Sequence, residues 1–202
     1  MSPALFPEES MALGRVLPMR RREFATGRAC ARKALAALGI PPQPILIGAQ
    51  REPLWPNGVV GTLTHCPGYC AAVVGSERQF AAVGVDAEPN VDLPEGVLAI
   101  ISCEKERELI RTLQRRQEVK WDRLLFSAKE SIYKAWFTIT RSWLEHRDVL
   151  LSTDALSGMF EGKILVANDV RKGTNLCRFE GRYLVRKGLI LTAVCVGRAE
   201  IG

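Results

Sequence analysis

Two acidic residues at the end of a predicted strand are the first candidates for chemistry. Residues 82–89 read AVGVDAEP, which places Asp86 and Glu88 two positions apart. Side chains alternate along a strand, so both carboxylates point to the same face, about 6.5–7 Å apart at the backbone. Carboxylates this close repel each other, and a hard divalent cation relieves the repulsion. The pattern favours a Mg²⁺ site, although two exposed acids on a solvated sheet face would have the same spacing.

A third acid, Glu130, lies in a helix predicted over residues 119–138. One face of this helix is an apolar stripe, and Glu130 lies on another face among aromatic residues. A buried carboxylate costs several kcal/mol unless it is paired or bound to a metal. Lys134, one turn later, is a candidate partner; an exposed Glu–Lys pair is the alternative and would contribute only about 0.3–0.5 kcal/mol. The stripe comprises Trp121, Leu124, Leu125, Ala128, Ile132, Ala135 and Trp136, and the aromatic residues around Glu130 are Phe126, Tyr133 and Phe137.

Hydroxyl, imidazole and guanidinium groups suggest phosphate contacts. Thr64 and His65 end a predicted strand, where a hydroxyl and an imidazole can bind phosphate together. A helix predicted over residues 20–38 carries a basic stripe with Arg20 at its edge and Arg28 near its centre. A lone His is more often structural, and a run of charges is often only a solvated face. Together with the acids, these groups indicate phosphoryl transfer on a polyphosphorylated small molecule.

Hydrophobic patterning predicts an α+β fold. The two helices named above and a third over residues 102–115 alternate with short strands and turns. The strands are predicted within 59–88 and within 163–197, one of them over 163–167. Segments 70–75 and 192–197 are faintly alike, which is weak support for a duplicated architecture.

Composition limits the class of protein. The chain has 202 residues, 47% of them hydrophobic and 25% charged, and a net charge of +6. These values exclude a disordered or collagen-like chain. No stretch approaches the roughly 18 apolar residues of a membrane span, and Glu8 and Glu9 stand where a signal peptide would be basic and apolar. The six cysteines contain no CxxC pair, so we expect free thiols and a cytoplasmic protein.

Five blocks of sequence, in this order, resemble the 4′-phosphopantetheinyl transferases of the Sfp/EntD type. The last two blocks are highly specific in their order and spacing, and the others are supportive. The resemblance covers most of the chain, and its blocks are REFATGR at 22–28 with Ala31 and Arg32, WPNG at 55–58, LTHC at 63–66, VGVDAEP at 83–89 and FSAKESIYKAW at 126–136.

The resemblance implies a coenzyme A-dependent transferase. A carrier-protein serine would attack the β-phosphate of coenzyme A, accept the phosphopantetheine arm and release 3′,5′-ADP. Asp86, Glu88 and Glu130 would hold Mg²⁺, with Mn²⁺ as a substitute. Either Glu130 or a metal-bound water would accept the serine proton, and Lys134 would neutralise charge on the diphosphate. The contacts to coenzyme A implied by the resemblance are Arg20, Arg28, Thr64 and His65 on phosphates and Arg51 and Glu52 on the adenine side.

The implied fold has two pseudo-symmetric lobes, each a small antiparallel sheet packed against a long helix, with the ligand site between them. Residues 1–88 would form the first lobe and 89–202 the second, in one compact unit. Relatives have a further stretch ahead of residues 5–9, so this chain either starts late or lacks an edge strand. Gln50 stands where relatives often have Lys, so one phosphate contact would be either missing or taken over by Arg51.

The implied partner is an acyl or peptidyl carrier protein with an acidic recognition helix, which suits the basic net charge. We expect a monomer and no binding to nucleic acid or membrane. Two alternatives stay open at this point. One is a nucleic-acid-binding module that uses the arginine stripe, although its aromatic residues are not interleaved with basic ones. The other is a non-catalytic protein that binds coenzyme A or another nucleotide.

Overall fold

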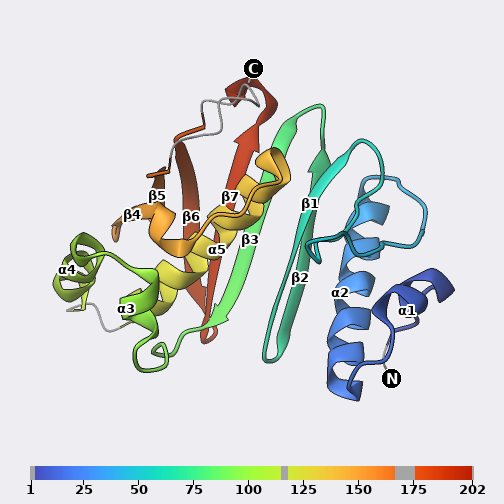
Figure 1. The fold of residues 1–202 in the computed structure, drawn as a ribbon, viewed down its shortest axis with the longest axis horizontal. Coiled ribbons are helices and arrows are strands. Elements are labelled where there is room, and N and C mark those ends of the chain that lie inside the picture. Colours follow the sequence, from blue (N-terminus) through green and yellow to red (C-terminus); the bar gives the residue numbers. More distant parts are fainter. Residues whose placement is uncertain (1–2, 115–117, 167–175, 202) are drawn as a thin grey trace.

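The structure, a computed structural model, describes residues 3–114, 118–166 and 176–201. It is an α+β fold with two antiparallel sheets (Figure 1). The smaller sheet pairs β1 (Val59–Cys66) with β2 (Tyr69–Ser76). The larger sheet has five strands in the order β3-β7-β6-β5-β4. Their bounds are Phe80–Pro89 for β3, Val149–Asp154 for β4, Met159–Ile164 for β5, Arg178–Arg186 for β6 and Leu189–Gly197 for β7.

Two helices precede the small sheet. The short helix α1 (Pro7–Leu13) lies beside α2 (Pro18–Ala37), and α2 packs against β2 (Figure 1). This confirms the predicted basic helix to within two residues at its start. Pro18 opens α2 at a position where its missing N–H costs nothing, and Gly39 follows its end with a positive φ. A small apolar cluster under this helix contains Ala31, Leu35, Ile45 and Val59.

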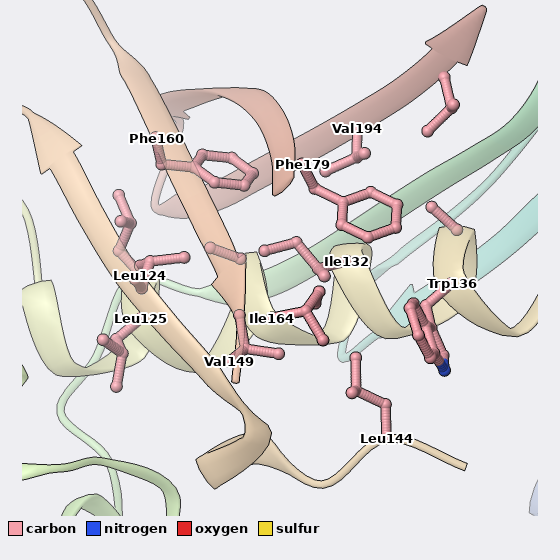
Figure 2. Close-up of a cluster of buried hydrophobic side chains, with 14 of the residues drawn as sticks. Leu124, Leu125, Ile132, Trp136, Leu144, Val149, Phe160, Ile164, Phe179 and Val194 are labelled. Carbon is pink, nitrogen blue, oxygen red and sulfur yellow. The ribbon is translucent and has the colours of Figure 1, made fainter. Parts of the chain in front are cut away.

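The long helix α5 (Trp121–Thr140) lies across the five-stranded sheet, and the main apolar core fills the space between them. Figure 2 shows Ile132 and Trp136 of α5 among Phe160, Phe179 and Val194 of the sheet. All seven residues of the predicted apolar stripe are buried. The stripe therefore orients α5, and this orientation fixes which of its polar residues face β3.

Strand β3 is not part of the sheet that the sequence predicted for it. We expected residues 59–88 to form the sheet of an N-terminal lobe. In the structure β3 pairs with β7, with Gly84 opposite Val194 and Asp86 opposite Thr192. Alternation indicates which way a side chain points but does not identify the neighbouring strand. A boundary at residue 88 therefore separates β3 from its own sheet.

The segment before α5 also differs in detail. The helix predicted over 102–115 is α4 (Glu104–Leu113), preceded by the short α3 (Val97–Ile101), and residue 115 lies outside the described residues. The N-cap of α4 is Cys103, and the hydroxyl of Ser102, just before it, donates to the Leu98 carbonyl.

Strands β4 and β5 differ from the strands predicted from the sequence. The strand predicted at 163–167 is represented by β5, which starts and ends earlier, and residue 167 lies outside the described residues. Strand β4 was not predicted. It follows a single 3-10 turn, η1 (His146–Asp148), which connects it to the end of α5. No helix in the described part of the chain is long and apolar enough to cross a membrane.

Gly84 allows α5 to approach β3 closely. A Cβ atom at position 84 would overlap the backbone carbonyl of Ser131 on α5. Because the overlap is with backbone, no side-chain movement can relieve it. Gly84 is thus required for the packing that brings the polar face of α5 onto β3.

We expect Gly84→Ala to lower the free energy of unfolding by more than about 3 kcal/mol, because α5 must move away from β3. Urea denaturation followed by circular dichroism measures this. Gly27→Ala is the matched control: its Cβ would meet nothing within 4 Å. That helical substitution should be neutral or stabilising by about 0.5–1 kcal/mol. If both substitutions changed the free energy of unfolding equally, the close contact of α5 with β3 would not be the reason for glycine at position 84.

Candidate functional site

Asp86 lies at the junction of β3, α5 and β1. Its side chain is only 8% exposed. From α5, Lys134 Nζ donates to Asp86 Oδ1 over 2.7 Å and to the Val85 carbonyl over 2.9 Å. Ser127 Oγ, two turns earlier on the same helix, donates to Asp86 Oδ2 over 2.9 Å. Each oxygen of this buried carboxylate therefore accepts a hydrogen bond from α5.

Thr64 connects the small sheet to the large one at the same place. Its buried hydroxyl donates to Asp86 Oδ1 over 3.2 Å and accepts from the Ala87 backbone N–H over 2.9 Å. Strand β3 is an edge strand of the large sheet, so its outward N–H groups need partners elsewhere. The hydroxyl of Thr64 is the partner of one such N–H group, that of Ala87, and its bond to Asp86 also holds this carboxylate in place.

Glu88 has its own basic partner. Arg123 Nη1, from the first turn of α5, lies 3.0 Å from Glu88 Oε2, and both side chains are largely buried. Burial raises the pKa of Glu88, and the charge of Asp86 raises it further. Arg123 lowers this pKa, while Glu130 adds a smaller increase. The three predicted metal ligands therefore influence one another electrostatically.

Glu130 is partly buried and faces away from Lys134. Its Oε1 lies 2.9 Å from His146 Nε2 of η1, but without the geometry of a hydrogen bond. The imidazole stacks on Phe126, with ring centroids 5.5 Å apart. The expected Glu130–Lys134 pair is therefore absent, because Lys134 reaches across to Asp86 on β3 instead. Of the predicted aromatic neighbours of Glu130, Tyr133 lines the same cavity and Phe126 contacts its partner His146, whereas Phe137 lines a different cavity.

Each of the three acids thus has a separate basic side chain beside it, Lys134, Arg123 or His146. Within residues 3–114, 118–166 and 176–201, no three His, Cys, Asp or Glu side chains are gathered closely enough to hold a metal ion. In kind, however, the donors fit a hard cation, since all three are carboxylates. Burial is the main cause of the raised pKa of Glu88, and the negative charges of Asp86 and Glu130 add to it, so a cation at this place would be favourable for all three acids.

A cavity of about 810 Å³ opens beside Lys134 and Thr64. Its walls come from α2, β1, the loop 47–57 and the C-terminal half of α5. The predicted contact residues for coenzyme A line it, with the exception of Asp86. Those residues are Arg20, Arg28, Arg51, Glu52, Thr64, His65 and Lys134. Arg141 and Arg198 line it as well. The cavity is therefore rich in cationic side chains.

Arg28 is already used by the fold. Its side chain is buried, and Nε and Nη2 donate to the carbonyls of Ile45 and Leu46, over 2.6 and 3.2 Å. The guanidinium lies 4.2 Å from the centre of the Phe24 ring. Burial lowers the pKa of Arg28 to about 10. Two of its nitrogen atoms therefore hold the segment after α2, and the predicted phosphate role stays untested.

Arg20 and His65 form an exposed group at the cavity edge. Glu23 lies between them, 3.3 Å from Arg20 Nη1 and 3.8 Å from His65 Nε2. Such pairs contribute little to stability at an exposed position. The guanidinium of Arg20 and the imidazole of His65 therefore both remain accessible to an anionic ligand.

Arg141 is a cavity residue that the sequence analysis missed. It caps α5 in a left-handed conformation, with φ +55°, and its Nη1 lies 3.7 Å from Glu52 Oε1. The signal was available, since Arg141 follows Lys134 by seven positions and therefore lies on the same face of a helix. Arg51 also has a positive φ, so two strained residues lie on the cavity wall.

A second cavity, of about 360 Å³, lies on the other side of Tyr133. Tyr133 lines both cavities, while Glu130 and His146 line the smaller one. Exposed apolar side chains of Ile100 and Trp143 also line it. Burial raises the pKa of the Tyr133 hydroxyl, and Glu130 and Glu52 raise it further. Lys134 therefore lines a basic cavity, Glu130 lines a smaller and more apolar one, and Tyr133 lines both.

Comparison with known proteins identifies the family. Residues 8–75 match the model of the 4′-phosphopantetheinyl transferase N-terminal domain, and residues 82–172 match that of the 4′-phosphopantetheinyl transferase superfamily. The division between the two models falls between β2 and β3, as the sheet pairing does.

Three relatives match over nearly the whole chain. The transferase Svp of Streptomyces mobaraensis is 48% identical over 95% of this chain and 78% of its own length. PptT of Mycobacterium tuberculosis is 47% identical, over 93% and 84%. Npt of Nocardia iowensis is 43% identical, over 93% and 87%. All three are 4′-phosphopantetheinyl transferases by name. This chain therefore belongs to the 4′-phosphopantetheinyl transferase superfamily.

Proposed function

We propose that the site around Asp86, Glu130 and Lys134 transfers the 4′-phosphopantetheine arm of coenzyme A to a serine of an apo carrier protein. The observation that carries this proposal is that Lys134 and Glu130, one turn apart on α5, line two unlike cavities that share Tyr133. Coenzyme A has a matching division into a nucleotide with three phosphates and a long, uncharged arm. Its diphosphate connects the two parts.

The two cavities suit the two halves of coenzyme A. The 810 Å³ cavity is lined by cationic groups, including Arg20, Arg51, His65 and Arg141, which would hold the nucleotide and its 3′-phosphate. The 360 Å³ cavity is lined by Ile100, Trp143 and other apolar residues, which would take the arm. The diphosphate would then lie at Lys134, near Tyr133.

The transfer forms one bond and breaks another at the β-phosphorus. The serine oxygen bonds to this phosphorus as its bond to the bridging oxygen of the leaving 3′,5′-ADP breaks. In our proposal Glu130 accepts the serine proton. Lys134, held by Asp86 and the Val85 carbonyl, neutralises the charge that develops on the leaving phosphate. Thr64 and Ser127 keep Asp86 in place.

Mg²⁺, or Mn²⁺ in its place, belongs to the same proposal. Asp86, Glu88 and Glu130 would hold it. A divalent cation bound to a diphosphate neutralises charge and orients the phosphates. Arg123 and His146, which now lie beside Glu88 and Glu130, would have to share these acids with it.

The partner would be an acyl or peptidyl carrier protein of fatty-acid, polyketide or nonribosomal-peptide synthesis. An acidic recognition helix on this partner would suit the net charge of +6. We propose that the protein acts as a monomer. A cytoplasmic location suits the six free cysteines.

We also propose that the protein has two pseudo-symmetric lobes, one built on helix α2 and the other on helix α5, with the ligand site between them. The two similar segments, 70–75 and 192–197, lie in β2 and β7, which supports this relation.

The first test measures transfer. An apo carrier protein incubated with this protein, coenzyme A and Mg²⁺ should gain the mass of one phosphopantetheinyl group. Glu130→Gln and Asp86→Asn should each lower the rate by at least about 100-fold, because they remove a proton acceptor and a charge. Glu108→Gln, an exposed substitution on α4, is the control and should keep full activity. No mass gain with several unrelated carriers would contradict the proposed function, and a fully active Glu130→Gln would contradict the role of Glu130.

The second test removes the metal. A chelator should stop transfer, and Mg²⁺ should restore it. Glu88→Gln should raise the Mg²⁺ concentration for half-maximal rate by about tenfold, equivalent to about 1.4 kcal/mol. The exposed Glu95→Gln variant should leave that concentration unchanged. Transfer that persists in excess chelator would overturn the metal assignment without affecting the proposed transfer itself.

A further inference from the structure

A fully buried ion pair contains the residue that precedes Glu130 in the chain. Lys129 of α5 and Glu106 of α4 are each only 1% exposed, and Lys129 Nζ lies 2.8 Å from Glu106 Oε1. The pair lies outside the set of site residues proposed above. Lys129 nevertheless precedes Glu130 in the chain and lines the smaller cavity beside it.

All hydrogen-bonding groups of this pair are occupied. An ammonium has three donors. Lys129 directs them to Glu106, to the Ile101 carbonyl over 2.9 Å and to the His146 carbonyl over 2.8 Å. Glu106 accepts in turn from two backbone N–H groups. These belong to Leu151, over 2.7 Å, and Cys103, over 2.9 Å.

The partners of Lys129 are the segments that form the cavity wall. Ile101 ends α3, and His146 begins η1. Both segments line the 360 Å³ cavity. Arg147 also joins them, donating to the carbonyls of Ile100 and Ala99 over 2.9 and 2.7 Å. Arg147 is exposed, however, so the buried contacts of Lys129 hold the two segments more firmly.

Stability alone does not account for a pair of this kind. Removing two ions from water costs several kcal/mol, and replacing a buried pair by apolar residues is often neutral or stabilising. What apolar residues cannot supply is a set of directed bonds to two separate backbone carbonyls. The pair therefore has a geometric consequence that an apolar replacement would lose.

We propose that Lys129, through its buried pair with Glu106, is a positioning residue that sets the wall of the smaller cavity relative to Glu130. The inference rests on the proposed function, in which this cavity takes the arm of coenzyme A. It predicts a selective effect. Loss of the pair should weaken binding of coenzyme A but not of 3′,5′-ADP, which has no arm and needs only the larger cavity.

The decisive variant is the double substitution Lys129→Met and Glu106→Leu, which removes both charges together. We expect it to fold, to bind 3′,5′-ADP within about twofold of the parent protein and to bind coenzyme A roughly 10–100-fold more weakly in calorimetry. Amide hydrogen exchange in segments 99–101 and 146–148 should become faster. Glu104→Gln, an exposed acid on α4 with its own partners Arg107 and Arg111, is the control and should change neither ligand.

A second variant covers the case in which the apolar pair does not fold. Lys129→Gln with Glu106→Gln keeps polar groups at both positions but offers two side-chain donors at position 129 where Lys129 has three. Its loss of coenzyme A affinity should be in the same direction and smaller. The positioning role would be overturned if the affinities for coenzyme A and 3′,5′-ADP fell equally. It would also be overturned if amide hydrogen exchange stayed unchanged in both segments. A parent protein that binds both ligands but transfers nothing would instead overturn the proposed function, because binding and exchange still test the role of Lys129.

Discussion

The close contact between α5 and β3 is the constraint on which the site depends. Gly84 leaves room for the Ser131 carbonyl, so the two backbones meet without side chains between them. Asp86 is then within reach of both Ser127 and Lys134, which lie on the same side of α5. A wider separation would leave Asp86 buried without its cation, at a cost of several kcal/mol. The geometry of the acidic site is therefore set by the absence of a side chain two residues earlier.

Periodicity predicted the long helices well. It could not predict which distant residues and strands pair with one another. The stripe on α5 and the basic helix α2 follow from local spacing, because burial on one face of a helix needs no knowledge of the rest of the fold. The sheet of β3 and the partner of Glu130 depend on which segments meet in space. Arg28 shows the same limit. Its sequence context resembles a phosphate contact, but its guanidinium donates to carbonyls 17 and 18 residues away.

The pairing of each acid with a base has consequences for ligand binding. Asp86 and Glu88 are held beside the cationic Lys134 and Arg123, and Glu130 lies beside the imidazole of His146, so each acid has a basic neighbour before a ligand arrives. A diphosphate brings negative charge that these same bases can bind. The acids would then need a new cation, which is what a divalent metal arriving with the diphosphate provides. Charge balance thus links the proposed metal and the proposed substrate, since either one alone would leave one set of charges without partners.

The two cavities differ in how firmly their walls are held. The loop 47–57, which lines the larger cavity, is attached to α5 by an ion pair of 3.7 Å between Glu52 and the exposed Arg141, and such pairs contribute little. The smaller cavity is walled by segments that a buried and fully hydrogen-bonded Lys129 holds in place. The larger cavity can therefore adjust to a ligand at low cost, whereas the side with Glu130 is fixed in advance. This division suits a transferase, because atoms close to the reacting phosphorus must be positioned more accurately than those that only anchor the nucleotide.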